Sequence, residues 1–271
     1  MQTGSLLTGS FPDPEVIEAD IARDGFKVYP GAVRLEPLRE MHAFWTAYFR
    51  EARPNRSTVR SNLRLGEENF NSYSDTSQWC LFRDFDFLWN TPTHALTRQL
   101  GVEVHRLRNR AQRFADDRGL GYAADCYGIY ISTSCYRPGT GHLRSHSDGH
   151  EGAPILQYMV PITHKGIDYE TGGLFVKGGK DGAKIDVDAQ MKPGDIVFFD
   201  GRVEHGVDTI GGGEASPGRL ASFAIPTFFK TRGALPGVLR GAEDVYFDAR
   251  EWLSGKLKGK AARAEGDPDH G

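Results

Sequence analysis

The sequence predicts an α+β fold with a mainly β core, in which a helical N-terminal part leads into a β-sandwich or jelly roll. Apolar residues recur at helical spacing within residues 13–119, whereas short strand-like runs separated by Gly, Pro and Asp fill residues 125–230. Strands and helices do not alternate along the chain, which argues against a doubly wound parallel sheet. We expect one domain over residues 1–254, followed by a charged, disordered tail over residues 255–271.

The first helix is predicted to begin at Asp13-Pro14, because Asp is a frequent N-cap residue and Pro suits the first helical position. Gly25 should end this helix, since glycine adopts the left-handed conformation that often closes one. A short strand should then cover residues 26–29.

Two further helices are predicted, one from about Pro37 and one from Thr91-Pro92 to about Gly119. Their apolar stripes are Leu38, Met41, Trp45 and Phe49 in the first, and Leu96, Leu100, Leu107, Ala111 and Phe114 in the second. Residues 51–80 between them are polar and irregular, which indicates a long loop of the kind that often serves as a lid or binding segment.

The second half of the chain reads as strands. Residues 127–136 alternate in side-chain character with period two, and shorter strand-like runs follow. These runs lie near residues 155–162, 173–177, 184–188, 195–199 and 219–229.

Composition excludes several classes of protein. The net charge of −3 and the absence of a basic stripe argue against nucleic-acid and membrane partners. Three cysteines without a C-x-x-C pair make neither a disulfide framework nor a zinc knuckle, and free thiols suit the cytoplasm. Residues 1–10 lack the pattern of a signal peptide, and no apolar run is long enough for a transmembrane helix.

Arginines are concentrated in residues 51–90, where aromatic residues accompany them. The positions are Arg53, Arg56, Arg60, Arg64 and Arg83, with Phe70, Tyr73, Trp79 and Phe82. The first four arginines could form a solvated loop face or a site for a carboxylate or phosphate. The mixture as a whole could hold a polar, anionic small molecule.

A candidate metal site begins with His146 and Asp148. In an extended segment, residues two apart point the same way, so this pair could bind one metal ion, although it could equally be a hydrogen-bonded surface pair. His142 and His150 flank it and are alternative ligands or plain loop residues.

His205 completes the candidate site. It follows a Pro-Gly-Asp turn at residues 193–195 and an apolar strand, and antiparallel pairing could bring it beside His146 and Asp148. Two His and one carboxylate leave three coordination positions open, which is the facial triad of non-haem iron(II) oxygenases.

Arg219 starts an apolar strand fourteen residues after His205. A charge among apolar residues needs an anionic partner, and the planar guanidinium suits a carboxylate. That partner could be a ligand or a protein Asp or Glu.

In this order, His-x-Asp, Pro-Gly-Asp-strand-His and Arg resemble the Fe(II)/2-oxoglutarate-dependent dioxygenase superfamily, and most of all its phytanoyl-CoA-dioxygenase-like branch. Residues 21–31 are similar to that branch's opening segment, and the resemblance covers residues 13–230. It implies a double-stranded β-helix (jelly roll) with N-terminal flanking helices. It also implies Fe(II) at His146, Asp148 and His205, and 2-oxoglutarate on Arg219.

The sequence departs from the family pattern at Ala221, where many members have Ser two residues after the Arg. Ser222 comes one residue later and faces the other way in a regular strand. The missing hydroxyl at the 2-oxoglutarate carboxylate could come from Ser222 at a bulge, or from Tyr130 or Tyr158.

The resemblance implies an oxidoreductase that uses Fe(II), 2-oxoglutarate and O₂ to hydroxylate or otherwise oxidise a C–H bond, releasing succinate and CO₂. Asp148 argues against halogenation, because related halogenases have a small residue there. We expect a small polar substrate, such as an amino acid or an intermediate of natural-product biosynthesis. Two alternatives stay open: a cupin-type metal enzyme without 2-oxoglutarate, and a non-catalytic jelly-roll binding module.

Overall fold

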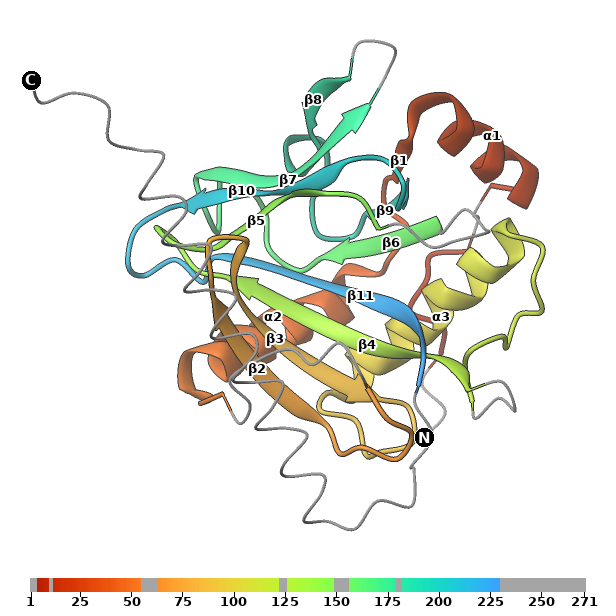
Figure 1. Cartoon of the computed structure of the whole chain (residues 1–271), viewed down its shortest axis with the longest axis horizontal. Helices are drawn as coiled ribbons and strands as arrows, with labels where there is room; N and C mark the ends of the chain where they lie inside the picture. Colours follow the sequence, from red (N-terminus) through yellow and green to blue (C-terminus); the bar gives the residue numbers. More distant parts are fainter. Residues whose placement is uncertain are drawn as a thin grey trace, which may run out of the picture. The chain divides into compact units, whose positions relative to one another are not determined.

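The computed structural model describes residues 4–9, 12–54, 63–121, 126–148, 156–178 and 182–229. Within these ranges the chain forms a jelly roll with flanking helices, as predicted (Figure 1). The predicted tail, the end of the predicted domain after residue 229, and Arg56, Arg60 and His150 lie outside the described residues. Among the described helices, none combines the length and apolar character that crossing a membrane requires.

The described elements follow the order that the sequence predicts, with strands dominating after the third helix. The helices are α1 (Pro14–Asp24), α2 (Leu35–Glu51), α3 (Ala95–Ala111) and the short 3-10 helix η1 (Asp188–Gln190). The strands before α3 are β1 (Phe26–Tyr29), β2 (Phe70–Asp75) and β3 (Trp79–Phe87). Those after it are β4 (Tyr127–Tyr136), β5 (His142–His146), β6 (Leu156–Pro161), β7 (Thr171–Gly178), β8 (Ala183–Asp186), β9 (Ile196–Asp200), β10 (His205–Gly211) and β11 (Arg219–Phe228).

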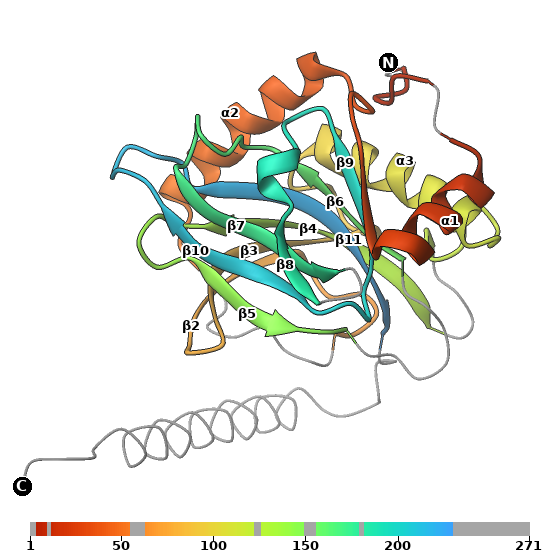
Figure 2. The ribbon, with the colours of Figure 1, turned by 90° about the horizontal axis from the view of Figure 1, so that it is seen from above.

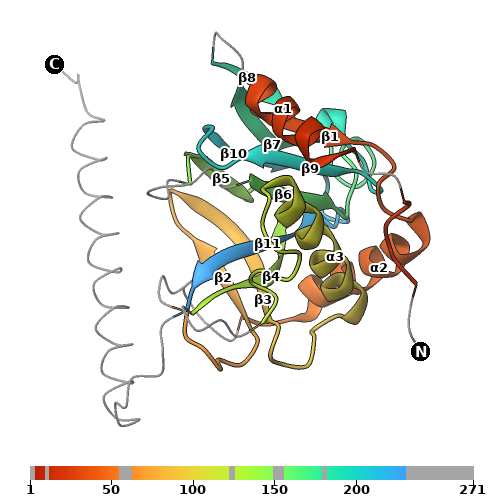
Figure 3. The same ribbon diagram turned by 90° about the vertical axis from the view of Figure 1, so that its right-hand side faces the viewer.

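All strand pairs between these elements are antiparallel, and one continuous order connects them: β1-β9-β6-β11-β4-β3-β5-β10-β7-β8, with β2 paired to β3. We call β9, β6, β11 and β4 the major sheet, and β5, β10, β7 and β8 the minor sheet. Strand β3 joins the two sheets, because it pairs with both β4 and β5. Figures 2 and 3 show α2 and α3 covering the major sheet, with the minor sheet on its other side.

Two apolar cores follow from this arrangement. The outer core lies between the helices and the major sheet, and includes Met41, Trp45, Leu100, Tyr158, Phe198 and Leu220. The inner cluster comes from both sheets and fills the space between them. It comprises Phe26, Met159, Leu174, Val176, Val187, Met191, Val197, Phe199 and Ala221, with Phe223 packed against it.

The local signals of α1 and β4 are confirmed. Pro14 is the first residue of α1, and Gly25 closes it with φ at 79°, a left-handed conformation that glycine adopts without strain. Strand β4 has the predicted bounds, because its alternation separates an outer-core face from an inner face.

The predicted loop over residues 51–80 is wrong in its second half. Strands β2 and β3 form an antiparallel hairpin there, with Phe70 opposite Phe85. Thr76 shapes the turn, since its Oγ1 accepts hydrogen bonds from the backbone N–H groups of Gln78 and Trp79. Strand β2 buries polar side chains, so its sequence shows no apolar alternation.

Helix boundaries also differ from the predicted ones. Helix α2 begins at Leu35, before Pro37, because the first turn of a helix does not need the N–H group that proline lacks. Helix α3 begins at Ala95 and ends at Ala111, well before Gly119. The buried Asn109 side chain donates to the carbonyls of Asp116 and Arg118, which folds the following residues back onto the helix.

A polar network crosses the interface between α2 and the β2–β3 hairpin. The Tyr48 hydroxyl donates to Asp84 Oδ1 at 2.8 Å, and Asn71 Nδ2 donates to the Tyr48 hydroxyl at 2.8 Å. Asp84 is only 2% exposed, and burial raises the pKa of its carboxyl to about 7. In the unfolded chain this group ionises near pH 4. The folded state therefore binds the additional proton between about pH 4 and pH 7, and stability falls as the pH rises through that window.

Asp84→Asn should remove this pH dependence, because the amide cannot ionise and still accepts the hydrogen bond from Tyr48. Relative to the parent chain, the variant should gain on the order of 2 kcal/mol between pH 5 and pH 8. Urea unfolding at both pH values measures the gain. Asp75→Asn, at an exposed site of β2, serves as the control and should gain nothing. Parallel stability curves for Asp84→Asn and the parent chain would contradict the assignment.

Candidate functional site

The first two residues of the candidate site come from the end of β5. His146 is the last residue of this strand, and Asp148 follows two positions later. The backbone N–H of Asp148 donates to the carbonyl of Gly201 at 2.8 Å, which holds it against the loop before β10. The segment is thus fixed to its neighbour directly beside the site.

His205 is the first residue of β10, the strand between β5 and β7. The backbone register places it opposite His146 on one side and Val176 on the other. The Pro-Gly-Asp turn before β9 is held by Asp195, whose carboxylate accepts hydrogen bonds from the N–H groups of Gly31 and Lys192, both at 2.9 Å. Strand β9 begins directly after this turn, and the loop that follows β9 leads to His205.

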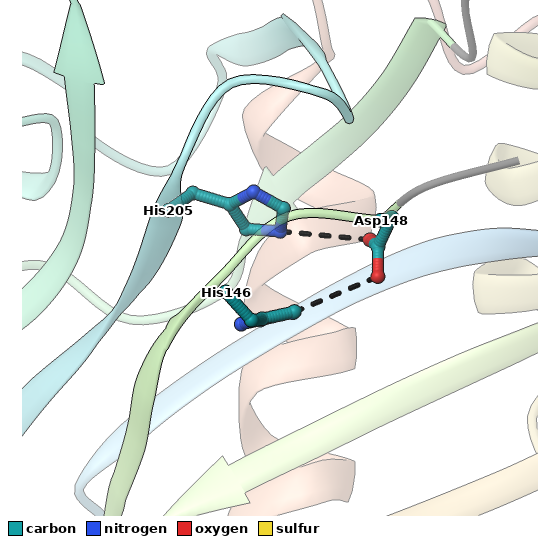
Figure 4. A group of neighbouring side chains, drawn as sticks. All are labelled: His146, Asp148 and His205. Carbon is teal, nitrogen blue, oxygen red and sulfur yellow. Dashed lines mark ion pairs between the residues drawn. The ribbon is translucent and has the colours of Figure 1, made fainter.

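The three side chains converge at one point (Figure 4). His146 Nε2 lies 3.7 Å from Asp148 Oδ1, and His205 Nε2 lies 3.6 Å from Asp148 Oδ2. One ligand atom from each residue lies within 4.8 Å of the others, so the group could hold a metal ion. The side chain of Asp148 is 38% exposed and that of His205 is 6% exposed, which places the group at the border between solvent and the interior.

The imidazole rings are oriented for coordination through Nε2. His146 Nδ1 contacts the carbonyl of Arg144 at 3.0 Å, and His205 Nδ1 contacts the carbonyl of Val203 at 2.8 Å. A carbonyl only accepts, so each Nδ1 carries the proton and the Nε2 lone pair of the neutral ring is free. Both rings therefore offer the tautomer that binds a metal.

Asp148 is ionised at neutral pH. Its partial burial raises the pKa, but hydrogen bonds with His205 and Gln157 and the charges of His205 and His146 outweigh burial and lower the pKa to about 2; the two histidines contribute in this way only while their rings are protonated and no metal is bound. Gln157 Nε2, from β6, donates to Oδ2 of the carboxylate. This glutamine was not singled out from the sequence, and no local pattern marks it.

Arg219 begins β11, on the major sheet, and is 1% exposed. Its partner among the described carboxylates is Asp188 of η1: Nε donates to Oδ2 at 2.5 Å and Nη2 donates to Oδ1 at 3.0 Å. Burial lowers the pKa of Arg219, but the Asp188 carboxylate outweighs it and the pKa is raised. Nη1 is buried without a hydrogen-bond partner among the described residues.

Asp188 is itself held by neighbouring groups. The Tyr169 hydroxyl donates to its Oδ2 at 2.6 Å, and the N–H of Leu174 donates to the same atom at 2.9 Å. Gly173, with φ at 112°, gives this carboxylate room, since a Cβ there would come within 2.2 Å of Oδ2. The sequence leaves a protein carboxylate open as the partner of Arg219 but does not single out Asp188, because the two residues are 31 positions apart.

The three hydroxyl residues suggested for the co-substrate lie on different faces. Tyr130 is on the inner face of β4, where Arg83 and Asp148 both influence its pKa. Tyr158 faces the helices and donates to the carbonyl of Gly101 in α3 at 2.7 Å. Ser222 lies between Leu220 and Ala224 of the outer core along a regular ladder, so it points away from Arg219 and Ala221. The structure brings neither Ser222 nor Tyr158 to Arg219.

His142, which flanks the candidate metal site in the sequence, does not belong to the cluster of His146, Asp148 and His205. His142 Nδ1 contacts the carbonyl of Thr140 at 2.8 Å, and the cluster that could hold a metal among the described residues does not include it.

Asp188→Asn should destabilise the fold strongly, because it leaves the guanidinium of Arg219 buried without a counter-charge. We expect a loss of about 3–5 kcal/mol in the free energy of unfolding, measured by chemical denaturation. Asp208→Asn is the matched control: its carboxylate pairs with Lys184 at 2.5 Å, but both side chains are 47% exposed. That surface pair should contribute less than about 1 kcal/mol. Equal losses in the two variants would refute a special role for the buried pair.

Comparison with known proteins identifies the fold. No family model matches the chain, and no curated protein matches it. Among solved structures, a prolyl-4-hydroxylase from Pseudomonas putida is 17% identical with a TM-score of 0.54, covering 79% of this chain and 98% of that one.

Two further solved structures are similar to this chain. AviO1 from Streptomyces viridochromogenes is 15% identical with a TM-score of 0.52, covering 84% of this chain and 98% of that one. The non-haem α-ketoglutarate-dependent epimerase SnoN, from nogalamycin biosynthesis, is 14% identical with a TM-score of 0.50, covering 83% and 90%. The chain therefore has the jelly-roll fold on which non-haem, 2-oxoglutarate-dependent enzymes are built.

Proposed function

We propose that this chain is a non-haem iron(II)- and 2-oxoglutarate-dependent oxygenase that oxidises a C–H bond of a small polar molecule. The observation that carries the proposal is the convergence of His146, Asp148 and His205. Two neutral imidazoles and one carboxylate on one side of a metal leave adjacent positions open for a chelating co-substrate and O₂.

The donor set fits iron(II). Both Nε2 atoms are unprotonated in the tautomer fixed by Arg144 and Val203, and the Asp148 carboxylate is charged. Gln157 holds one carboxylate oxygen and thereby orients it. A carboxylate at position 148 also occupies the position that halogenases keep open for chloride, so we propose oxygenation rather than halogenation.

The interior fits a dicarboxylate co-substrate. The Nη1 amino group of Arg219 is buried and lacks a partner among the described residues, and such a donor is costly unless a ligand satisfies it. We propose that the distal carboxylate of 2-oxoglutarate accepts this hydrogen bond. The adjacent inner cluster is apolar and would keep water from the bound co-substrate.

When bound, iron with 2-oxoglutarate and O₂ supplies the oxidising chemistry, with succinate and CO₂ as co-products. The protein's part is to hold the co-substrate and to place the C–H bond of the substrate. The solved structures with this fold include a hydroxylase and an epimerase, so the outcome of the reaction depends on substrate placement. A cytoplasmic location belongs to the same proposal, since Cys80, Cys126 and Cys135 are free thiols.

Replacing His146 or Asp148 by Ala should weaken metal binding by more than about a hundredfold, because each removes a proposed ligand. Titration of the purified chain with Fe(II) under anaerobic conditions measures the affinity. His142→Ala removes a histidine from the same strand and should bind iron as the parent chain does. Full retention of iron affinity in both ligand variants would remove the basis of the proposal.

Arg219→Gln should raise the dissociation constant for 2-oxoglutarate by about tenfold or more while iron binding stays near normal. Because this variant also breaks the pair with Asp188, Arg219→Lys, which keeps the charge, should fold and retain part of the affinity. Calorimetric titration with 2-oxoglutarate and assay of succinate release test both. Iron binding without 2-oxoglutarate binding in the parent chain would instead favour a cupin-type metal enzyme.

A further inference from the structure

A second guanidinium, that of Arg83, lies on the inner side of the sheet without a counter-charge among the described residues. Along β3, Leu81, Arg83, Phe85 and Phe87 share one face, because side chains alternate. Three of the four pack into apolar clusters with residues of β4. Arg83 is the charged member of this row.

The guanidinium of Arg83 lies over two aromatic rings. Its guanidinium carbon lies 5.0 Å from the centre of the Phe85 ring and 5.6 Å from that of Phe223. Phe223 packs against the inner cluster, and Phe199 of that cluster lies 5.0 Å from the ring of His205. A continuous apolar contact path therefore leads from Arg83 to the candidate metal site.

Arg83 acts electrostatically on two tyrosines of β4, Tyr130 and Tyr136. Burial raises the pKa of Tyr130. The charge of Arg83 and a hydrogen bond between the two side chains oppose this rise, whereas the charge of Asp148 adds to it. Burial also raises the pKa of Tyr136, on which Arg219 and Arg83 both act in the opposite direction. Arg83 therefore acts electrostatically on both tyrosines, one of which also responds to Asp148 and the other to Arg219.

The hydrogen bonding of Arg83 is incomplete. Its Nε donates to Ser132 Oγ at 3.4 Å, at the long limit of a hydrogen bond. The neighbouring carboxylates of β3 face the other way: Asp84 accepts from Tyr48, and Asp86 pairs with Arg98. Among the described residues, no carboxylate forms an ion pair with Arg83. Its hydrogen-bond partners there are the neutral hydroxyl groups of Ser132 and Tyr130, so the positive charge is not balanced.

Arg219 is the contrasting case. Its Nε and Nη2 groups donate to Asp188, which leaves the Nη1 group for a ligand. A partly exposed guanidinium that has no ionic partner and lies beside aromatic rings is suited to a carboxylate on a molecule with an apolar part.

We propose that Arg83 is a carboxylate-binding residue for the substrate, and hence that the substrate is a small carboxylic acid whose apolar part contacts Phe85 and Phe223. The assignment to the substrate rests on the proposed function. The carboxylate could otherwise belong to the co-substrate, and the experiment distinguishes these two sources.

The test uses phenylacetate and its neutral analogue phenylacetamide as probes on the full-length chain. Binding is followed by ligand-observed NMR with Zn(II), which is diamagnetic, and saturating 2-oxoglutarate. The parent chain should bind phenylacetate about tenfold more tightly than phenylacetamide, the gain expected of a charge-assisted fork. Arg83→Gln should abolish this preference and leave phenylacetamide binding unchanged.

Two further variants control the result. Arg83→Lys keeps the charge without the fork and should retain part of the preference. Arg39→Gln, at an exposed position of α2, should behave as the parent chain does. An unchanged preference in Arg83→Gln, or no preference in the parent chain, would overturn the proposal.

A titration with 2-oxoglutarate separates the two sources of the carboxylate. With Arg83 on the substrate, Arg83→Gln should bind 2-oxoglutarate within about twofold of the parent chain, whereas Arg219→Gln should lose at least about tenfold. If Arg83→Gln loses 2-oxoglutarate and phenylacetate competes with it, Arg83 serves the co-substrate and the assignment to the substrate is overturned. If the parent chain binds no 2-oxoglutarate but retains the Arg83-dependent preference, the carboxylate site stands and the proposed oxygenase function fails.

Discussion

The backbone pairing of β10 between β5 and β7 is the constraint on which the rest of the site depends. It sets His205 opposite His146, while the N–H of Asp148 is tied to Gly201 in the loop that precedes β10. A shift of one residue in this register would turn His205 to the other face of the sheet. The convergence of three side chains is thus a consequence of strand pairing, and the same pairing assembles the minor sheet that closes the jelly roll.

Charge inside the jelly roll is handled in two different ways. Arg219 is fully buried and is neutralised by Asp188, which Tyr169 and the Leu174 N–H hold in place. Arg83 is half-buried, rests on aromatic rings and has no ionic partner among the described residues. The first arrangement is required for folding, because an unpaired buried cation is very costly. The guanidinium of Arg83 is partly solvated, so it needs no protein counter-charge and can bind a ligand carboxylate.

The errors of the sequence analysis have a common physical origin. Strand β2 has no recognisable strand pattern in the sequence because its buried side chains are partly polar, and Asn71 donates to Tyr48 of α2, more than twenty residues away. The end of α3 was placed too late because apolar spacing continues past Ala111, whereas the Asn109 side chain folds the following turns back. In both places, side-chain hydrogen bonds to distant parts of the chain replaced the local apolar pattern.

The sequence by itself determined the elements with strong local signals: α1 between its proline and its glycine, β4 from its alternation, and the class of β-sandwich or jelly roll from the run of short strands. It also determined which residue types could form a metal site, because His-x-Asp in an extended segment needs only local geometry. The tertiary structure alone decided that Asp188 neutralises Arg219, that Ser222 and Tyr158 face the helices, and that Arg83 lies on the inner face with only neutral hydroxyl partners among the described residues. Those outcomes depend on sheet register and on partners far away in the chain, which no local pattern encodes.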